Sequence, residues 1–133
     1  CKVYPFRYVH QMISTVEAEL SSEIKVTKAI AACFPMGSMT GAPKLRAMQL
    51  IEQYEMSKRG LYSGAVGYID PKGDFDFNVV IRSILYRSDT SYLSMQVGSA
   101  LTASSEPEKE YDECLLKAKG VIETIAQQIP INL

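Results

Sequence analysis

Three segments rich in β-branched and aromatic residues follow one another in the second half of the chain, separated only by short turns. We expect strands at residues 61–69, 75–86 and 92–101. Residues 70–73 (Asp-Pro-Lys-Gly) are typical of a hairpin turn, and residues 87–91 of a looser connection. Short connections of this kind join antiparallel strands, so the order of the segments predicts an antiparallel meander.

Helices are expected on both sides of these strands. Pro43 suits the first turn of a helix. The apolar residues after it repeat at i, i+3, i+4 and i+7, and this helix should end near Glu55. A long final helix begins where Ser105 and Glu108 have capping-box spacing and where Pro107 is tolerated in the first turn. Its expected apolar face consists of Tyr111, Leu115, Ala118, Ile122 and Ile125.

The first part of the chain predicts a strand at residues 8–20, a short helix at 25–33 and a loop at 34–41. The full order of elements predicts an α+β fold in which helices cover an antiparallel sheet. The first strand has no obvious partner in the chain, and an exposed strand edge promotes pairing with other chains. We therefore expect further sequence, or a second copy in a homodimer, to cover it.

Length and composition exclude several classes of protein. The chain has 133 residues and a formal net charge of −1, whereas partners of nucleic acids and membranes usually carry clustered basic surface. No apolar run approaches the length of a membrane span. Cys1, Cys33 and Cys114 are far apart and lack metal-ligand spacing, which favours a reduced, cytoplasmic protein. The start at Cys1, in what reads as mid-domain sequence, suggests a truncated domain.

Two features could bind an anion. A glycine-bearing loop at residues 37–44 leads into a helix, where backbone amides, hydroxyl groups and Lys44 can hold negative charge. A plain loop-to-helix junction explains the same residues. Arg82 lies in a strand otherwise rich in valine and isoleucine, where it could donate two hydrogen bonds to a substrate carboxylate. A structural ion pair or a solvated strand face would explain Arg82 equally.

Two further features bear groups suited to catalysis. Glu110 and Glu113 lie one turn apart on the final helix and could coordinate Mg²⁺. The ordinary interpretation is a solvated face on which Glu113 and Lys117 form an i, i+4 ion pair. His10 is the sole histidine and suits proton transfer near neutral pH, but no partner for it is evident.

Several motifs in order resemble one family. Residues 34–48 (Phe-Pro-Met-Gly-Ser-Met-Thr-Gly-Ala-Pro-Lys-Leu-Arg-Ala-Met) are similar to the signature of chorismate-utilising aminases. Residues 62–68 (Tyr-Ser-Gly-Ala-Val-Gly-Tyr) and 81–83 (Ile-Arg-Ser) continue it, and the segment from Ser105 to Ala118 completes it. The resemblance covers nearly the whole chain and implies the C-terminal portion of a chorismate-binding domain, with its α/β sandwich fold.

The resemblance implies the chemistry. In this family ammonia replaces the ring hydroxyl of chorismate at C4 or C2 with the help of Mg²⁺. Anthranilate synthase then eliminates pyruvate, whereas aminodeoxychorismate synthase stops before that step and a separate lyase makes p-aminobenzoate for folate. A glutamine amidotransferase subunit or domain normally supplies the ammonia. A dianionic substrate of this kind needs a metal together with positive or amide donors.

The resemblance also implies roles for individual residues. Tyr62 and Arg82 would hold the enolpyruvyl carboxylate, while Lys117 would lie near a substrate carboxylate. Ser38 would place a hydroxyl beside the ring. Gly98 and Ala100 would offer backbone amides to substrate carboxylates. Glu113 would be a direct Mg²⁺ ligand, with Glu110 close by.

The sequence departs from the family pattern at three points. The family often has a histidine where this chain has Gln11, and His10 is one place earlier, on the opposite side of the strand. Gln11 is therefore the catalytic candidate at that position. The family's Gly-x-Gly turn is Gly98-Ser99-Ala100 here, and alanine has less backbone freedom than glycine. The family's N-terminal portion, with further metal ligands, is absent, so we expect the chain alone to be inactive.

The C-terminal motif and Gln11 favour aminodeoxychorismate synthase component I, with anthranilate synthase component I as the alternative. Isochorismate and salicylate synthases use water as the nucleophile and usually lack the Gly-Ala-Pro-Lys block at residues 41–44. A different class of function also fits the chain, namely a non-catalytic fragment that binds a small carboxylate or a partner chain.

Overall fold

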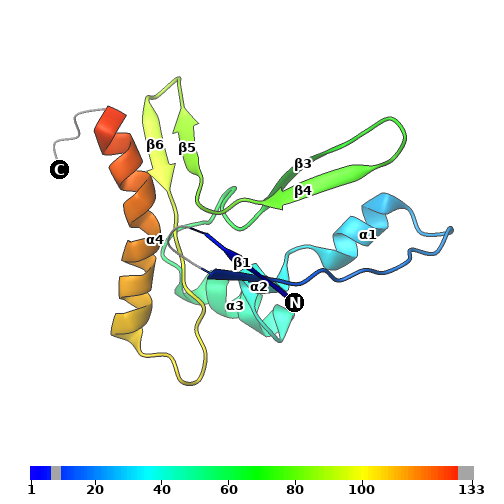
Figure 1. Ribbon diagram of the computed structural model, residues 1–133, viewed down its shortest axis with the longest axis horizontal. Helices are drawn as coiled ribbons and strands as arrows, with labels where there is room; N and C mark the ends of the chain where they lie inside the picture. Colours follow the sequence, from blue (N-terminus) through cyan, green and yellow to red (C-terminus); the bar gives the residue numbers. More distant parts are fainter. Residues whose placement is uncertain (7–9, 129–133) are drawn as a thin grey trace. The chain divides into compact units, whose positions relative to one another are not determined.

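The computed structural model describes residues 1–6 and 10–128, which form two compact units, Cys1–Phe34 and Pro35–Leu133. The first unit contains β1 (Lys2–Pro5), β2 (His10–Ile13) and α1 (Val26–Cys33). The second unit contains α2 (Gly37–Thr40), α3 (Lys44–Tyr54), β3 (Ala65–Ile69), β4 (Phe75–Val79), β5 (Ile84–Arg87), β6 (Tyr92–Met95) and α4 (Pro107–Gln128) (Figure 1). Antiparallel strands and helices together confirm the α+β class.

The first unit is a β-hairpin followed by a helix. β1 pairs antiparallel with β2, with Lys2 opposite Ile13 and Pro5 opposite His10. The prediction that the first strand has no partner in the chain is therefore wrong. The predicted strand was also too long: residues 14–20 are irregular, because the apolar side chains there find no surface to cover, and Val16 is 93% exposed. Residues 8 and 9 lie outside the described residues.

The predicted helix after Pro43 is present as α3, and the predicted loop before it contains a short helix. α3 ends as predicted, where the N–H of Glu55 donates to the carbonyl of Ile51 at 3.0 Å. Pro43 has an extended ψ of 134° and caps α3 rather than lying in its first turn. The predicted loop at residues 34–41 contains the one-turn helix α2, in which the N–H of Gly41 donates to the carbonyl of Gly37 at 2.8 Å.

The strands of the second unit form two separate hairpins rather than one meander. β3 pairs with β4, with Ala65 opposite Val79, and β5 pairs with β6, with Ile84 opposite Met95. The predicted strand at residues 75–86 is interrupted at residues 80–83, where Arg82 has a φ of 50°. A left-handed residue turns the chain out of the extended conformation, so β4 and β5 cannot be one strand.

The hairpin turn between β3 and β4 is as predicted. The carboxylate Oδ1 of Asp70 accepts hydrogen bonds from the N–H groups of Lys72 (2.8 Å) and Asp74 (2.9 Å). This is how aspartate usually stabilises a tight turn.

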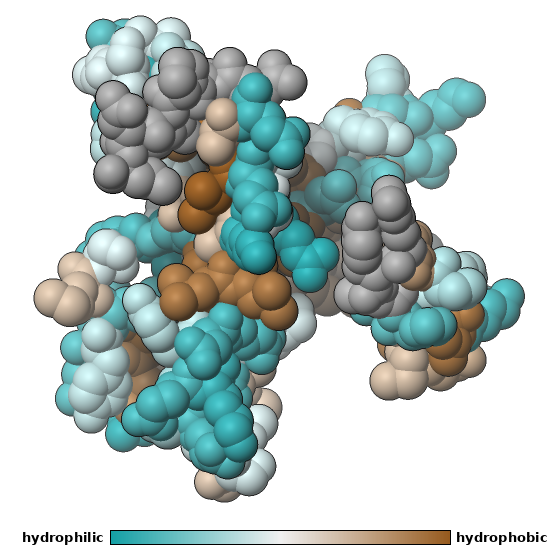
Figure 2. Space-filling view, turned by 60° about the vertical axis from the view of Figure 1, so that its left-hand side comes forward, coloured by the Kyte–Doolittle hydropathy of each residue, from teal (hydrophilic) through white to brown (hydrophobic). Residues whose placement is uncertain are grey.

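The buried face of α4 matches the predicted apolar face only in part, because it includes Ala118 and Ile125 but not Tyr111, Leu115 and Ile122. The partly buried positions are Glu110, Cys114, Lys117, Val121 and Ile125, which repeat at helical spacing next to buried Ala118. Tyr111, Leu115 and Ile122 of the predicted apolar face are 65%, 52% and 40% exposed. Glu110 and Lys117 on the buried face form hydrogen bonds with Ser99 and Gly98 in the segment after β6. Figure 2 shows apolar side chains open to solvent on the face in view.

The start of α4 also differs in detail. The Ser105 hydroxyl accepts a hydrogen bond from the N–H of Thr102 at 3.0 Å, so it stabilises the preceding turn.

In the part of the chain that the structure describes, no helix has the length and apolar character needed to cross a membrane.

Candidate active-site pocket

The second unit contains a pocket of about 620 Å³. Its walls come from α2, the turn before β3, the break between β4 and β5, the segment after β6, and α4. This volume suits a small organic ligand. The predicted site residues among its lining are Ser38, Tyr62, Arg82, Gly98, Ala100, Glu110 and Lys117. Segments up to about eighty residues apart in the chain, Ser38 and Lys117, thus meet at one cavity.

Arg82 lines the pocket from the break between β4 and β5. Its φ of 50° lies in the left-handed region, which costs a residue with a Cβ of the order of 1 kcal/mol and often marks a functional position. Among the described residues, the Arg82 guanidinium has no hydrogen-bond or ion-pair partner. A structural ion pair therefore does not explain Arg82, and its planar fork is available for a carboxylate.

Tyr62 and Gly98 approach each other closely on the pocket wall. A Cβ added at Gly98 would lie 2.8 Å from the Tyr62 hydroxyl, closer than non-bonded contacts normally allow. Glycine at position 98 therefore permits Tyr62 to lie where it does. Ala100 lies two residues further along the same wall and is exposed.

Lys117 connects α4 to this wall. Its Nζ donates a hydrogen bond to the carbonyl of Gly98 at 3.0 Å and forms an i, i+4 ion pair with Glu113 at 2.5 Å. The ordinary interpretation of Glu113 and Lys117 as an ion pair is thus present in the structure. Lys117 keeps a positive charge at the pocket, while Glu113 does not line it.

Glu110 is held by a residue that the sequence did not single out. The Ser99 hydroxyl donates a hydrogen bond to its carboxylate. This bond, with a second from Ser105 and the nearby charge of Lys117, lowers the pKa of Glu110 below its usual value against the opposing effect of desolvation. Glu110 is therefore a carboxylate at neutral pH. The sequence could have indicated this contact only through the hydroxyl of Ser99 between Gly98 and Ala100.

Comparison with known proteins identifies the family of the chain. The family model described as chorismate binding enzyme matches residues 1–123. This chain belongs to the chorismate-binding enzyme family. The match spans both units, so the loop at Ser38, the Tyr62 and Arg82 wall and the first half of α4 all lie inside the family region.

Two kinds of curated relative are similar to this member of the family. Anthranilate synthase component 1 of Mycolicibacterium smegmatis is 46% identical over 90% of the chain. A probable chloroplastic aminodeoxychorismate synthase of Oryza sativa is 42% identical over 96%, and an aminodeoxychorismate synthase of Streptomyces pristinaespiralis is 41% identical over 95%. The chain spans 23%, 14% and 17% of these three relatives.

Few of the described side chains near the pocket of this family member could bind a metal ion. Within residues 1–6 and 10–128, no group of three or more histidine, cysteine, aspartate or glutamate side chains could hold a metal ion. Glu110 and Glu113 offer carboxylate oxygens, the donor type that Mg²⁺ prefers. Mg²⁺ commonly uses one or two protein carboxylates and completes its shell with water and substrate. The donor chemistry fits, and magnesium at Glu110 and Glu113 stays a prediction.

Gln11 and His10 belong to the first unit. They occupy neighbouring positions of β2, opposite Tyr4 and Pro5, and both are exposed. The pocket within the second unit is lined without them. A catalytic role for Gln11 stays a prediction.

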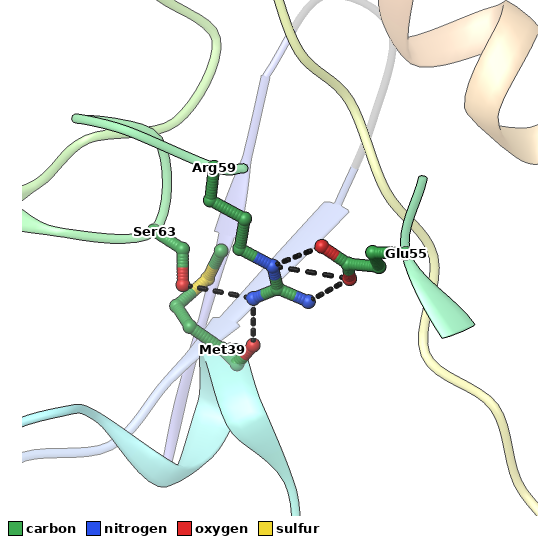
Figure 3. Close-up of polar contacts among 4 residues, drawn as sticks. All are labelled: Met39, Glu55, Arg59 and Ser63. Carbon is green, nitrogen blue, oxygen red and sulfur yellow. Dashed lines mark hydrogen bonds and ion pairs between the residues drawn. The ribbon is translucent and has the colours of Figure 1, made fainter. Parts of the chain in front are cut away.

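Arg59 is a pocket residue that the sequence did not single out. It lines the cavity near Ser38 and Tyr62 and bonds to Glu55, Met39 and Ser63 (Figure 3). Its spacing of four residues from Glu55 would predict only a surface ion pair at the end of α3. Nothing local in the sequence indicates the two other contacts.

Proposed function

We propose that the pocket binds chorismate and that the whole protein aminates it at C4 to give 4-amino-4-deoxychorismate. Ammonia would come from a glutamine amidotransferase subunit or domain, and the product would lead to p-aminobenzoate. The observation that carries the proposal is the guanidinium of Arg82, which has no partner among the described residues and shares one pocket with Tyr62 and Lys117. Donors and positive charge gathered around one cavity suit a ligand with two carboxylates.

The roles in this site divide between two sides of the substrate. Arg82 would donate paired hydrogen bonds to one carboxylate, and the Tyr62 hydroxyl would donate a third. Backbone amides at Gly98 and Ala100, with the charge of Lys117, would serve the other carboxylate. Ser38 would present its hydroxyl to the ring. Preorganised donors of this kind stabilise charge better than water because they need no reorientation during the reaction.

Glu110 and Glu113 would hold Mg²⁺. When bound, the ion would supply positive charge to a substrate carboxylate and to the departing ring oxygen. Ser99 would keep the Glu110 carboxylate ionised and oriented toward the pocket. Glu113 would exchange its present contact with Lys117 for the ion, which would free Lys117 for substrate.

Anthranilate synthesis is the second candidate. It is supported by the 46% identity to anthranilate synthase component 1, against 42% for the aminodeoxychorismate synthase of rice. Both reactions begin with the same substrate and use the same carboxylate donors. They differ in products, because anthranilate synthesis releases pyruvate and aminodeoxychorismate synthesis does not.

The test uses the full-length protein that contains this chain, with chorismate, Mg²⁺ and ammonium. Chromatography should detect 4-amino-4-deoxychorismate without pyruvate, whereas anthranilate with equimolar pyruvate would support the second candidate. Titration calorimetry that detects no Mg²⁺-dependent binding of chorismate would leave the non-catalytic alternative.

A substitution at Arg82 tests the carboxylate site. Arg82→Ala removes the fork and should weaken chorismate binding about 10- to 100-fold, the usual scale for a charged hydrogen bond. Arg82→Lys keeps the charge without the paired geometry and should recover only part of the affinity. Arg87→Ala is the matched control, since Arg87 pairs with Asp89 on an exposed turn. Unchanged binding in Arg82→Ala would remove Arg82 from the site.

A further inference from the structure

We propose that Arg59 is a positioning residue of the pocket, which holds the Ser38 segment and the Tyr62 segment in register with each other. The inference rests on the proposed function, because it concerns the same pocket. Arg59 forms no hydrogen bond with Tyr62 or Arg82, the two side chains proposed to bind the substrate carboxylate. The basis of the inference is the set of contacts that the Arg59 guanidinium makes.

The Arg59 guanidinium joins three segments (Figure 3). Its Nη1 donates hydrogen bonds to the carbonyl of Met39 at 2.7 Å and to the hydroxyl of Ser63 at 3.0 Å. Its Nε donates to the Glu55 carboxylate at 2.8 Å, and its Nη2 donates to the same carboxylate. The end of α3, the helix α2 and the turn before β3 therefore meet at one side chain.

These contacts occupy most of the donors that an arginine has. A guanidinium carries five N–H groups, and the bonds to Glu55, Met39 and Ser63 use four of them. The hydrogen bond with Glu55 also raises the pKa of Arg59 above its usual value, against the effect of burial. Arg59 is thus charged but already neutralised and engaged, in contrast to Arg82, so it is poorly suited to bind a substrate carboxylate.

The partners of Arg59 are next to proposed substrate-binding residues. Met39 follows Ser38, and Ser63 follows Tyr62. The guanidinium also lies 5.9 Å from the centre of the Tyr62 ring, within the range of a cation–π contact. Tyr62 is therefore held between Arg59 at its ring and Gly98 at its hydroxyl.

Ser63 shows why this turn needs support. It is buried, with 7% of its surface exposed, and it has a φ of 68°, which is unfavourable for a residue with a Cβ. Its N–H donates to the carbonyl of Val80 at 2.9 Å, and its hydroxyl accepts from Arg59. The backbone bond connects the turn to the residue after β4, while the side-chain bond connects it to α2 through Arg59.

The experiment measures steady-state kinetics of the full-length enzyme with Arg59→Ala and Arg59→Lys. A shift of the reacting groups by about 1 Å can cost a hundredfold in rate. We expect kcat/KM for chorismate to fall about 10- to 100-fold in Arg59→Ala, with partial rescue by Arg59→Lys. The control is Lys58→Ala, because Lys58 pairs with Glu52 on the exposed surface and does not line the pocket.

A double-mutant cycle with Tyr62→Phe separates positioning from general stabilisation. Tyr62→Phe removes the hydroxyl that Arg59 helps to place, so Arg59→Ala should cost several-fold less in that background. Additive effects, or a folded Arg59→Ala protein with kinetics within twofold of the parent, would overturn the proposal.

Hydrogen exchange keeps the proposal testable whatever the activity of the parent. Arg59→Ala should raise amide exchange at residues 36–41 and 61–64 together, and Lys58→Ala should leave both unchanged. If Arg59→Ala does not fold, Arg59→Lys serves for the same comparison. Unchanged exchange in both segments would sink the positioning role. A parent protein that does not turn over chorismate would instead refute the proposed function.

Discussion

Gly98 shows how a single hydrogen atom in place of a side chain shapes the pocket. The position tolerates the Tyr62 hydroxyl only because no Cβ is present, and its carbonyl also accepts the hydrogen bond from Lys117. Two proposed substrate-binding side chains thus depend on one backbone position. Gly98 therefore acts through the close approach of Tyr62 that it permits, and not through a side-chain group.

Gly98→Ala should therefore displace Tyr62. The added Cβ would lie 2.8 Å from the Tyr62 hydroxyl, so the end of the Tyr62 side chain would have to move. We expect chorismate affinity to fall about tenfold, as measured by titration calorimetry. Gly120→Ala is the control, because a Cβ at Gly120 has no neighbour within 4 Å among the described residues. Unaltered affinity in Gly98→Ala would mean that Tyr62 has no part in binding.

Ser99 makes a second residue-scale prediction through pH. It is the main cause of the lowered pKa of Glu110. A lowered pKa in the folded state adds stability above the unfolded value near pH 4.3, and that stability is lost as pH falls through the folded pKa. Ser99→Ala should raise the Glu110 pKa and flatten this acid dependence. A carboxyl NMR titration would show it, with Ser104→Ala as the control, and an unmoved pKa would contradict the assignment.

At the scale of elements, the interruption between β4 and β5 separates a plain hairpin from a pocket wall. β3 and β4 pair regularly up to Ala65 and Val79, and the left-handed Arg82 follows three residues after Val79. Ending the strand there places Arg82 on the lining of the pocket instead of within a continuous sheet. The strand break therefore also forms the proposed carboxylate site.

The β3–β4 hairpin depends on Gly67. A Cβ there would lie 2.0 Å from the carbonyl oxygen of Asp76, an atom of the partner strand's backbone that cannot move aside. We expect Gly67→Ala to lower the free energy of unfolding by about 1–3 kcal/mol. Gly120→Ala, in the open middle of α4, should raise it by about 0.5–1 kcal/mol. Urea unfolding of the full-length protein measures both, and equal effects would contradict the hairpin geometry.

At the scale of the whole molecule, little apolar surface is buried. Ala118 is the one apolar residue among those described that counts as buried, whereas Leu45, Tyr111 and Leu116 are 72%, 65% and 70% exposed. Burial of apolar surface is the main force that stabilises folded domains. The chain by itself therefore has a weak hydrophobic core, although most of the predicted site residues line its pocket.

The isolated chain should consequently bind hydrophobic dyes and unfold without a sharp transition, as loosely packed states do. It should also fail to aminate chorismate with Mg²⁺ and ammonium. Dye fluorescence, thermal melting and the amination assay check these expectations against the full-length protein. A cooperative melt or measurable turnover by the 133-residue chain would show that its packing suffices.

Local spacing and turn chemistry were enough to predict the α+β class, the end of α3 at Glu55, the hairpin turn at Asp70 and the family resemblance. These features depend on residues within a few positions of one another, where hydrogen bonding and periodicity act directly. The same local information wrongly placed Arg82 in a continuous strand, and it predicted only Ala118 and Ile125 of the buried face of α4 correctly.

Only the tertiary structure decided how Arg82, Arg59 and Glu110 are used. Two arginines line one pocket. Contacts with Met39 and Ser63 engage Arg59, while Arg82 has no partner within the part of the chain that the structure describes. The Ser99 hydroxyl bonds to Glu110, so the buried side of α4 includes this carboxylate as well as Ala118 and Ile125. Such outcomes depend on groups distant in sequence, whose contacts form only when the chain packs.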